Sequence, residues 1–382
     1  MEGLSTASGD AASTNPLLIR HPDPMTSTKT YVALALAFAA PALIAFGPKA
    51  DSIVFAPKDG TSVTKTFVQE MEFSLDDMGM LMNGEDSPMM PSMEMDMTVV
   101  QTVSVSDSYG PMKGRRPAKL SRTFDAISSE IGMEMTVDVM GQVNDEQVDG
   151  NGSSPLEGLT VDFTWDEDAG GYTRTFADDS DGNEEHLVGL VEDMDLRALL
   201  PTDEVSEGDE WDIELPGLVD ILAPGGNLVV DVEMGGEAAG AGPDPAMMSN
   251  VREMIGDILE GTATGKFAGT REVDGINVAV IEISIEIDTS NDMSEFFQEM
   301  VGDQIPAEVD MSLDRADVEF ALETSGELLW NIGAGHVYSL NLEGDSAVSM
   351  AMEMAIDAQG QSMVMEMSMT MSGTIKNTVS VE

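Results

Sequence analysis

Cysteine is absent from this chain of 382 residues, and histidine occurs only three times. The lack of cysteine excludes disulfide bonds, thiolate metal sites and a cysteine nucleophile. The sequence also contains no G-x-S-x-G nucleophile elbow, no H-E-x-x-H zinc motif and no G-x-x-x-x-G-K-[ST] phosphate loop. With none of these motifs present, we predict that the protein is not an enzyme.

Basic residues are scarce. The chain has 17 Lys and Arg against 71 Asp and Glu, which gives a formal net charge of -54. A surface of this sign repels nucleic acids and anionic lipid headgroups, and it attracts cations and basic partners. We therefore expect no nucleic-acid partner, whereas a cationic partner fits the charge.

Long apolar runs are scarce as well, and the one that stands out covers residues 31–46. A membrane-spanning helix needs about 20 apolar residues, whereas the apolar core of a signal peptide needs about 7–15. We interpret residues 31–50 as a signal peptide or signal-anchor behind a disordered region at residues 1–30. Met25 is an alternative start to Met1 that would leave a short basic stretch before the apolar run. The expected location is the periplasm or the cell surface, with the run either cleaved or kept as a membrane anchor.

Methionine is present in excess, at 31 of 382 residues. Much of it alternates with smaller or polar residues in two segments on either side of a polar turn at residues 357–361. The first segment includes Met350, Met352 and Met354, and the second includes Met363, Met365, Met367, Met369 and Met371. A period of two places every second side chain on one face of a strand. We predict a long hairpin over residues 346–375 with one thioether-rich face, and we interpret that face as core packing because methionine fills irregular interiors.

The same alternation recurs along the rest of the chain and predicts a mainly β protein. We expect long antiparallel meander sheets, curled or barrel-like, with a closed barrel or a sandwich as the second choice. The regions are an N-terminal β region at 51–150 and a C-terminal β-rich region at 151–382, which are either separate or one domain, joined by a polar connection at 141–155. An apolar stripe predicts one main covering helix at about 245–260, and helical spacing predicts a shorter helix at 187–200.

Two groups of residues are candidate metal ligands. Thioethers suit Cu(I), and the Gly/Pro-rich segment 76–91, expected to be a loop, carries Met78, Met80, Met82, Met89 and Met90. Oxygen ligands suit Ca²⁺, and an acidic turn carries Asp179, Asp181 and Asn183. The alternative for the second group is a solvated polar turn, since clusters of Gly, Asn and Asp mark turns.

Three short segments carry a resemblance. They are Phe55-Ala56-Pro57-Lys58-Asp59-Gly60, then Leu200-Pro201 followed by Val205-Ser206-Glu207-Gly208-Asp209-Glu210-Trp211, and Gly326-Glu327-Leu328-Leu329-Trp330. Together they resemble uncharacterised β-rich exported proteins of planctomycete-like bacteria that carry an L-P…V-x-x-G-D-x-W motif. The resemblance implies export and a β fold, and it implies no activity.

The sequence as a whole indicates an exported cell-envelope protein that acts as a non-enzymatic binding or structural module. A concave apolar face could hold a hydrophobic, lipid-like ligand. The alternative is a metal-binding protein that uses the methionine-rich segment for Cu(I) or the acidic turn for Ca²⁺.

Overall fold

The computed structural model describes residues 53–86, 92–139, 142–235, 259–294, 297–298, 310–358 and 361–382. Residues 48–382 form one compact unit. Its strands are β1 (Ser62–Met82), β2 (Glu85–Asp86), β3 (Ser92–Tyr109), β4 (Met112–Lys113), β5 (Arg116–Pro117), β6 (Lys119–Val139), β7 (Gln142–Ser153), β8 (Thr160–Asp166), β9 (Gly171–Phe176), β10 (Glu210–Asp212), β11 (Asp231–Met234), β12 (Gly261–Val273), β13 (Ile276–Asp292), β14 (Asp310–Asn331), β15 (His336–Ala358) and β16 (Gln361–Val381). The helical elements are η1 (Glu184–Leu187), η2 (Arg197–Leu199), η3 (Leu215–Leu218) and α1 (Val219–Leu222).

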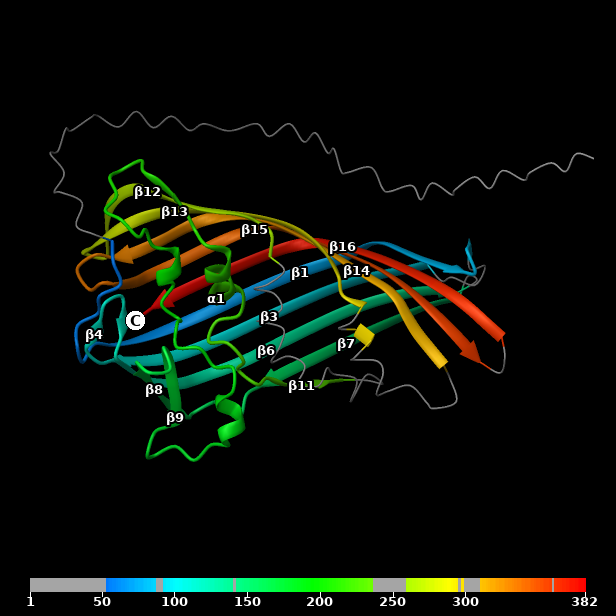
Figure 1. Cartoon of the computed structure of the whole chain (residues 1–382). Coiled ribbons are helices and arrows are strands. Elements are labelled where there is room, and N and C mark those ends of the chain that lie inside the picture. The colour runs from blue at the N-terminus through cyan, green and yellow to red at the C-terminus, as the bar shows by residue number, and fades with distance from the viewer. Residues whose placement is uncertain are drawn as a thin grey trace, which may run out of the picture. The chain divides into compact units, whose positions relative to one another are not determined.

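Nearly all of the strands belong to one antiparallel sheet of 14 strands (Figure 1). Its main path runs β10-β12-β13-β14-β15-β16-β1-β3-β6-β7-β11, with β2 beside β1 and with β8 and β9 beyond β6. The hairpin expected at residues 346–375 is confirmed as the end of β15 and most of β16, paired from Ser339↔Ser380 to Ala358↔Gln361. β16 then pairs with β1, so the last strand of the chain lies beside the first.

The expectation of a mainly β fold with a large antiparallel sheet is thus confirmed, whereas a closed barrel and a sandwich are not what forms. In the described part of the chain, β10 and β11 end the path and do not pair with each other. Both edge strands are short, at 3 and 4 residues, which leaves little unpaired backbone on them. The sheet is therefore an open, curled layer with two separate faces.

A diagonal of glycines allows the sheet to bend. Gly326, Gly344 and Gly373 lie on the neighbouring strands β14, β15 and β16. From each strand to the next, the glycine is displaced along the sheet by two residues, so that the three form a diagonal. A Cβ at these positions would lie 1.9, 1.9 and 1.8 Å from a backbone oxygen of the adjacent strand. Only glycine permits so close an approach, and glycine kinks are a recognised source of sheet curvature.

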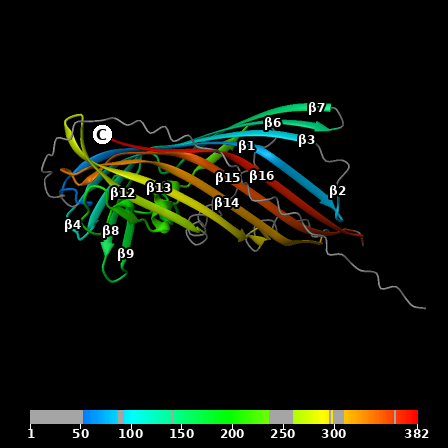
Figure 2. The same ribbon diagram turned by 90° about the horizontal axis from the view of Figure 1, so that it is seen from above.

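One face of the sheet is covered at one end by the segment that runs from η1 to residue 230. Figure 2 shows this segment, in green, on one side of the sheet, toward the end where the C-terminus lies. The covering residues that are buried include Leu190, Met194, Leu199, Leu218 and Ile221. They form one hydrophobic core with the inward side chains of the strands, such as Phe67, Val103, Phe163 and Val379. We call this sheet face the inner face.

Two sequence predictions about connections need correction. The expected helix at 187–200 is instead the end of the 3-10 helix η1, an irregular stretch and the three-residue η2, because Lys65 and Arg122 of the sheet bond carbonyls of this stretch. The expected polar connection at 141–155 is largely strand β7. The longest helical elements with described bounds have four residues, and they belong to the covering segment. Most of the main helix expected at 245–260 lies outside the described residues, and the two that are described, Leu259 and Glu260, are not helical.

Candidate functional site

A network of buried charges fastens the covering segment to the inner face. Lys65 in β1 is fully buried and contacts Asp107 in β3 at 2.5 Å and Asp195 of the covering segment at 2.7 Å. Arg122 in β6 donates to both carboxylate oxygens of Asp107, at 2.7 and 2.8 Å. Tyr109 donates to Asp195 and accepts from Lys65. The two cations and two carboxylates balance one another, so the network can lie in the core without a net charge.

The same cations also bind backbone of the covering segment. The Lys65 ammonium donates to the Met194 carbonyl at 3.1 Å. The Arg122 guanidinium donates to the carbonyls of Val191 and Glu192 at 3.1 and 3.0 Å. These bonds satisfy carbonyls that an irregular segment could not pair by itself. They hold residues 190–196 against the sheet in an irregular conformation instead of a helix.

Burial and pairing compete in setting the protonation of this network. Burial is the largest influence on Asp107 and would raise its pKa, but Arg122 and Lys65 together outweigh it and lower the pKa to about 2. Burial, followed by the negative charge of Asp195, raises the pKa of Tyr109 well above its usual value. Asp107 is therefore ionised and Tyr109 neutral at any pH near neutrality.

A second ionic group lies next to the first, on the covering segment itself. Arg197 contacts both Glu192 and Asp193, and it stacks over the Phe55 ring at 5.2 Å. Burial raises the pKa of Glu192 to about 7 even though Arg197 opposes the shift. One oxygen of Glu192 and one of Asp195 are buried without a hydrogen-bond partner within the described structure. Glu192 is therefore a buried carboxyl group whose pKa lies near neutrality.

These charged residues were missed in the sequence, although a signal was there. Lys65 stands between Val63 and Phe67 at an inward position of β1, and Asp107 stands between Val105 and Tyr109 in β3. Arg122 likewise stands between Leu120 and Phe124 in β6. In a strand whose apolar and polar residues alternate, a charged residue at one of the apolar positions indicates a buried ion. Ions are buried only with partners, so such a residue also indicates a buried ionic contact.

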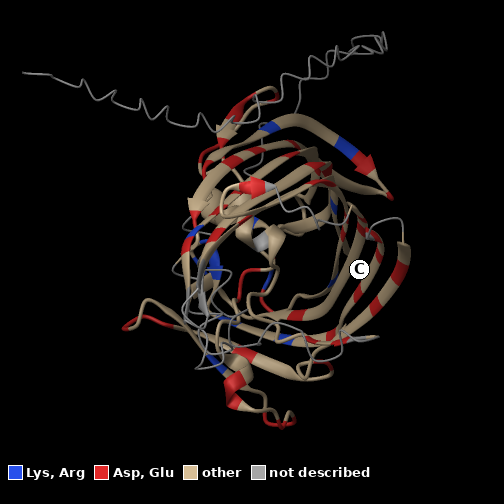
Figure 3. Cartoon of the chain, turned by 90° about the vertical axis from the view of Figure 1, so that its right-hand side faces the viewer, with Lys and Arg blue, Asp and Glu red and all other residues tan. Residues whose placement is uncertain are grey.

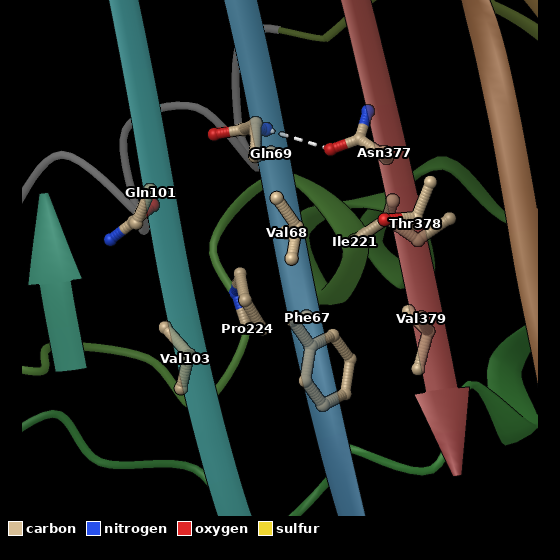
Figure 4. A pocket seen from close by; sticks show the side chains of 10 residues that line it. All are labelled: Phe67, Val68, Gln69, Gln101, Val103, Ile221, Pro224, Asn377, Thr378 and Val379. Atoms are coloured by element: carbon tan, nitrogen blue, oxygen red, sulfur yellow. Dashed lines mark hydrogen bonds between the residues drawn. The ribbon is translucent and has the colours of Figure 1, made fainter. Parts of the chain in front are cut away.

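The covered end of the inner face is closed. Between the sheet and the covering segment, beside Phe67, Val103 and Ile221, lies a cavity of about 10 Å³, about the room of one water molecule (Figure 4). One row further along the sheet the lining becomes polar, and the Gln69 amide donates to Asn377 at 3.0 Å. We call Gln101, Gln69 and Asn377 the polar belt. No organic ligand fits into this cavity.

Beyond the polar belt the inner face is lined by methionine. The register aligns thioethers across three neighbouring strands: Met350, Met369 and Met78 in one row, Met352, Met367 and Met80 in the next, and Met354, Met365 and Met82 in the third. A bulge between Leu75 and Asp77 keeps the β1 methionines on this face. On the other side of β1, Met95 lies opposite Met135 and Met97 opposite Met133. We call these residues the methionine face.

The interpretation of the methionines as core packing is wrong for this face. Every member is only half-buried, and none belongs to the hydrophobic clusters of the described chain. Among the described methionines, only Met194 and Met371 are buried. The methionines remain partly exposed because the strands are longer than the area that the covering segment packs on. Strands β15 and β16 have 23 and 21 residues, and the covering segment packs only on their ends nearest the ionic network.

The structure brings some of the candidate copper ligands together. Met78, Met80 and Met82 lie in β1 and not in a loop as expected, so each faces a β16 methionine directly across the sheet. Met89 and Met90 lie outside the described residues. Opposed side chains on neighbouring strands have Cβ atoms about 5 Å apart, which is closer than successive inward positions of a single strand.

The candidate calcium ligands are not drawn together into a recognisable site. Asn183 caps η1, where its side-chain oxygen accepts from the Glu185 N–H at 3.1 Å. Asp179 and Asp181 are exposed. Within the described residues there is no group of three His, Asp or Glu side chains placed to hold a metal ion.

The three segments that carry the resemblance pack at the covered end of the sheet. Trp330 is fully buried and donates to the Val54 carbonyl at 3.2 Å, and its ring meets Phe55 edge-on at 6.4 Å. Trp211 donates to the Leu199 carbonyl at 3.1 Å and covers Gly265, where a Cβ would lie 2.5 Å from the indole. In this structure, the motif residues hold the covered end of the sheet together.

Fold and geometry define a class, a mainly β protein built on one open antiparallel sheet that is packed at one end and thioether-lined beyond. No family model matches the chain, and no curated protein matches it. None of the helices in the described part of the chain has the length and apolarity needed to cross a membrane.

Proposed function

We propose that this chain is an exported, non-enzymatic binding protein of the cell envelope whose ligand is held on the methionine face. The observation that carries the proposal is the alignment of half-buried methionines across neighbouring strands, outside the packed core. Exposed apolar patches larger than a few hundred Å² are uncommon on monomeric proteins and mark binding surfaces. Methionine suits such a surface because it is flexible and polarizable.

The packed end of the sheet supports a scaffolding role and not a catalytic one. Its buried charged side chains are paired with one another, and the cavity in its core has a volume of about 10 Å³. A rigid scaffold beside an adaptable surface is a suitable arrangement for a binding module. The apolar run at 31–46 supports export, and N-terminal sequencing of protein recovered from intact cells would test it by showing whether that run has been removed.

Binding is tested with N-phenyl-1-naphthylamine, a neutral apolar probe whose fluorescence rises on leaving water. We expect the full chain to bind it and the double substitution Met352→Gln with Met367→Gln to bind at least about tenfold more weakly, a loss of about 1.4 kcal/mol. The matched control, Ala351→Gln with Ser368→Gln, alters the opposite face of the same two strands. Equal loss in both variants, or no binding by the native chain, would overturn the proposal.

A second candidate function, Cu(I) binding, is favoured by the same register, because rows of three thioethers replace the sulfurs that were expected in a loop. Replacing Met80, Met352 and Met367 by Leu keeps the face apolar and removes the sulfur. Cu(I) titration against a competing chelator should then show lost affinity while the apolar probe still binds. Unchanged Cu(I) affinity in this triple variant would rule out the row as a copper site.

A further inference from the structure

The methionine face lies in an unusually acidic part of the chain. Figure 3 shows Asp and Glu, in red, spread along the strands and few Lys or Arg, in blue. In the described portions of β1, β3, β6, β7, β14, β15 and β16 that lie beyond the polar belt, the basic residues are Arg315 and Lys376, and Lys376 is paired with Glu70. The acidic residues that alternate with the methionines on the opposite sheet face include Glu94, Asp96, Glu134, Glu353 and Glu366.

Acidic side chains also lie at the margin of the methionine face itself. Glu146, exposed on β7, is directly opposite Met135 of β6, so it projects on the same face. Glu85, exposed on β2, is directly opposite Met82 at the far end of β1. Glu353 and Glu366 oppose each other directly on the opposite face, where Arg315, opposite Glu353 on β14, relieves part of their repulsion. Positive groups of a bound partner would lie favourably near Glu85 and Glu146, which are on the methionine face itself.

We propose that the occupant of the methionine face is a basic amphipathic segment of another polypeptide, with apolar side chains against the thioethers and Lys or Arg toward Glu85 and Glu146. This inference rests on the proposed function and names its partner. Negative potential around an apolar surface selects against fatty acids and anionic lipids and favours cationic partners. A thioether surface accommodates different apolar side chains, which suits recognition by pattern instead of by one fixed sequence.

The test uses two fluorescent amphipathic peptides with the same apolar face, one with Lys and one with Glu at every polar position. The full chain should bind the Lys peptide at least about tenfold more tightly than the Glu peptide at low salt. The ratio should shrink as the ionic strength is raised past about 0.1 M, where the screening length is about 10 Å. Equal binding of the two peptides, or tighter binding of the Glu peptide, would overturn the inference.

Two pairs of substitutions separate the apolar contribution from the charge contribution. Glu85→Gln with Glu146→Gln should weaken the Lys peptide several-fold and leave the neutral naphthylamine probe unaffected. Met352→Gln with Met367→Gln should weaken both, and the control Ala351→Gln with Ser368→Gln should weaken neither. Circular dichroism of each variant confirms the fold.

The outcomes also separate this inference from the function on which it rests. If the neutral probe binds and neither peptide does, the methionine face is a binding surface with a different occupant, and the inference fails alone. If a zwitterionic lysophospholipid binds and displaces the probe while the Lys peptide does not, the occupant is a lipid. If the native chain binds neither the probe nor a peptide, both the inference and the proposed function fail.

Discussion

Lys65 and Asp195, 130 residues apart in the chain, are joined at 2.7 Å between the first long strand and the covering segment, and both are buried. Asp107 and Tyr109 complete the surroundings of the ammonium group, so neither ion of the pair faces water. A buried pair of this kind adds little net stability over an apolar pair, but it penalises any arrangement that leaves one ion alone. It therefore fixes where the covering segment lies on the sheet.

Asp195→Ala removes one partner and leaves the Lys65 ammonium buried with only Asp107 as a counter-ion. We expect the free energy of unfolding to fall by about 3–5 kcal/mol, the usual cost of breaking a buried ion pair from one side. Urea denaturation followed by circular dichroism measures the change. The control is Glu327→Ala, which breaks the Arg271 pair of similar length at 2.8 Å on the surface, and it should cost less than about 1 kcal/mol. Equal effects would show that burial of the network does not govern its energetics.

The free energy of unfolding should depend on pH through the protonation of Glu192. Burial raises its pKa in the folded chain from 4.5 to about 7, so the folded state binds the proton more tightly than the unfolded state does. The associated stability is present below about pH 4.5 and is lost as the pH rises to about 7, by an amount on the order of 3 kcal/mol. Urea unfolding at a series of pH values measures this loss.

The variant Glu192→Gln isolates that pH dependence from the repulsion among the many other acids. Its stability relative to the native chain should rise between about pH 4.5 and about pH 7. Asp107 acts in the opposite direction, because its lowered pKa gives stability that is lost as the pH falls from 3.8 to about 2. A constant difference between variant and native chain over the whole range would contradict the raised pKa of Glu192.

The bend of the sheet depends on glycine at specific positions, and Gly344 is the clearest test. Gly344→Ala would place a Cβ 1.9 Å from the Glu323 oxygen, so the strands must separate. We expect a loss of about 1–3 kcal/mol or more in the free energy of unfolding. Gly132→Ala in β6 is the control, since its Cβ would meet nothing within 4 Å, and it should be neutral or stabilise by about 0.5 kcal/mol. Thermal denaturation of both variants decides the matter.

The sequence was sufficient to predict those strands and hairpins that the local alternation of apolar and polar residues determines. The period of two along residues 346–375 and the polar turn at 357–361 predicted the β15–β16 hairpin, and the register confirms it. The same alternation along the rest of the chain predicted a mainly β protein with a large antiparallel sheet, which the structure confirms. It stopped β1 too early because Gly79 and the residues after Met82 look like a loop, whereas pairing with β16 extends the strand to Met82.

What the sequence could not show depends on contacts between distant residues. The β1–β16 pairing joins the two ends of the described chain, and no local pattern specifies it. The exposure of Met352 depends on where the covering segment stops, which is set by its bonds to Lys65 and Arg122. Alternation gives the face on which a side chain lies, but not whether another segment packs on it.

Oxidation chemistry can therefore map the methionine face. Hydrogen peroxide converts accessible methionines to sulfoxides, and buried thioethers are protected. Peptide mass spectrometry of the folded full chain should show Met352 and Met367 oxidised at least about tenfold faster than Met194, which is fully buried. Met371 is the internal control, because it belongs to the same alternating run and is only 8% exposed. Slow oxidation of Met352 and Met367, at the rate of Met371, would mean that the face is covered in the folded chain, and it would remove the surface on which the proposed binding depends.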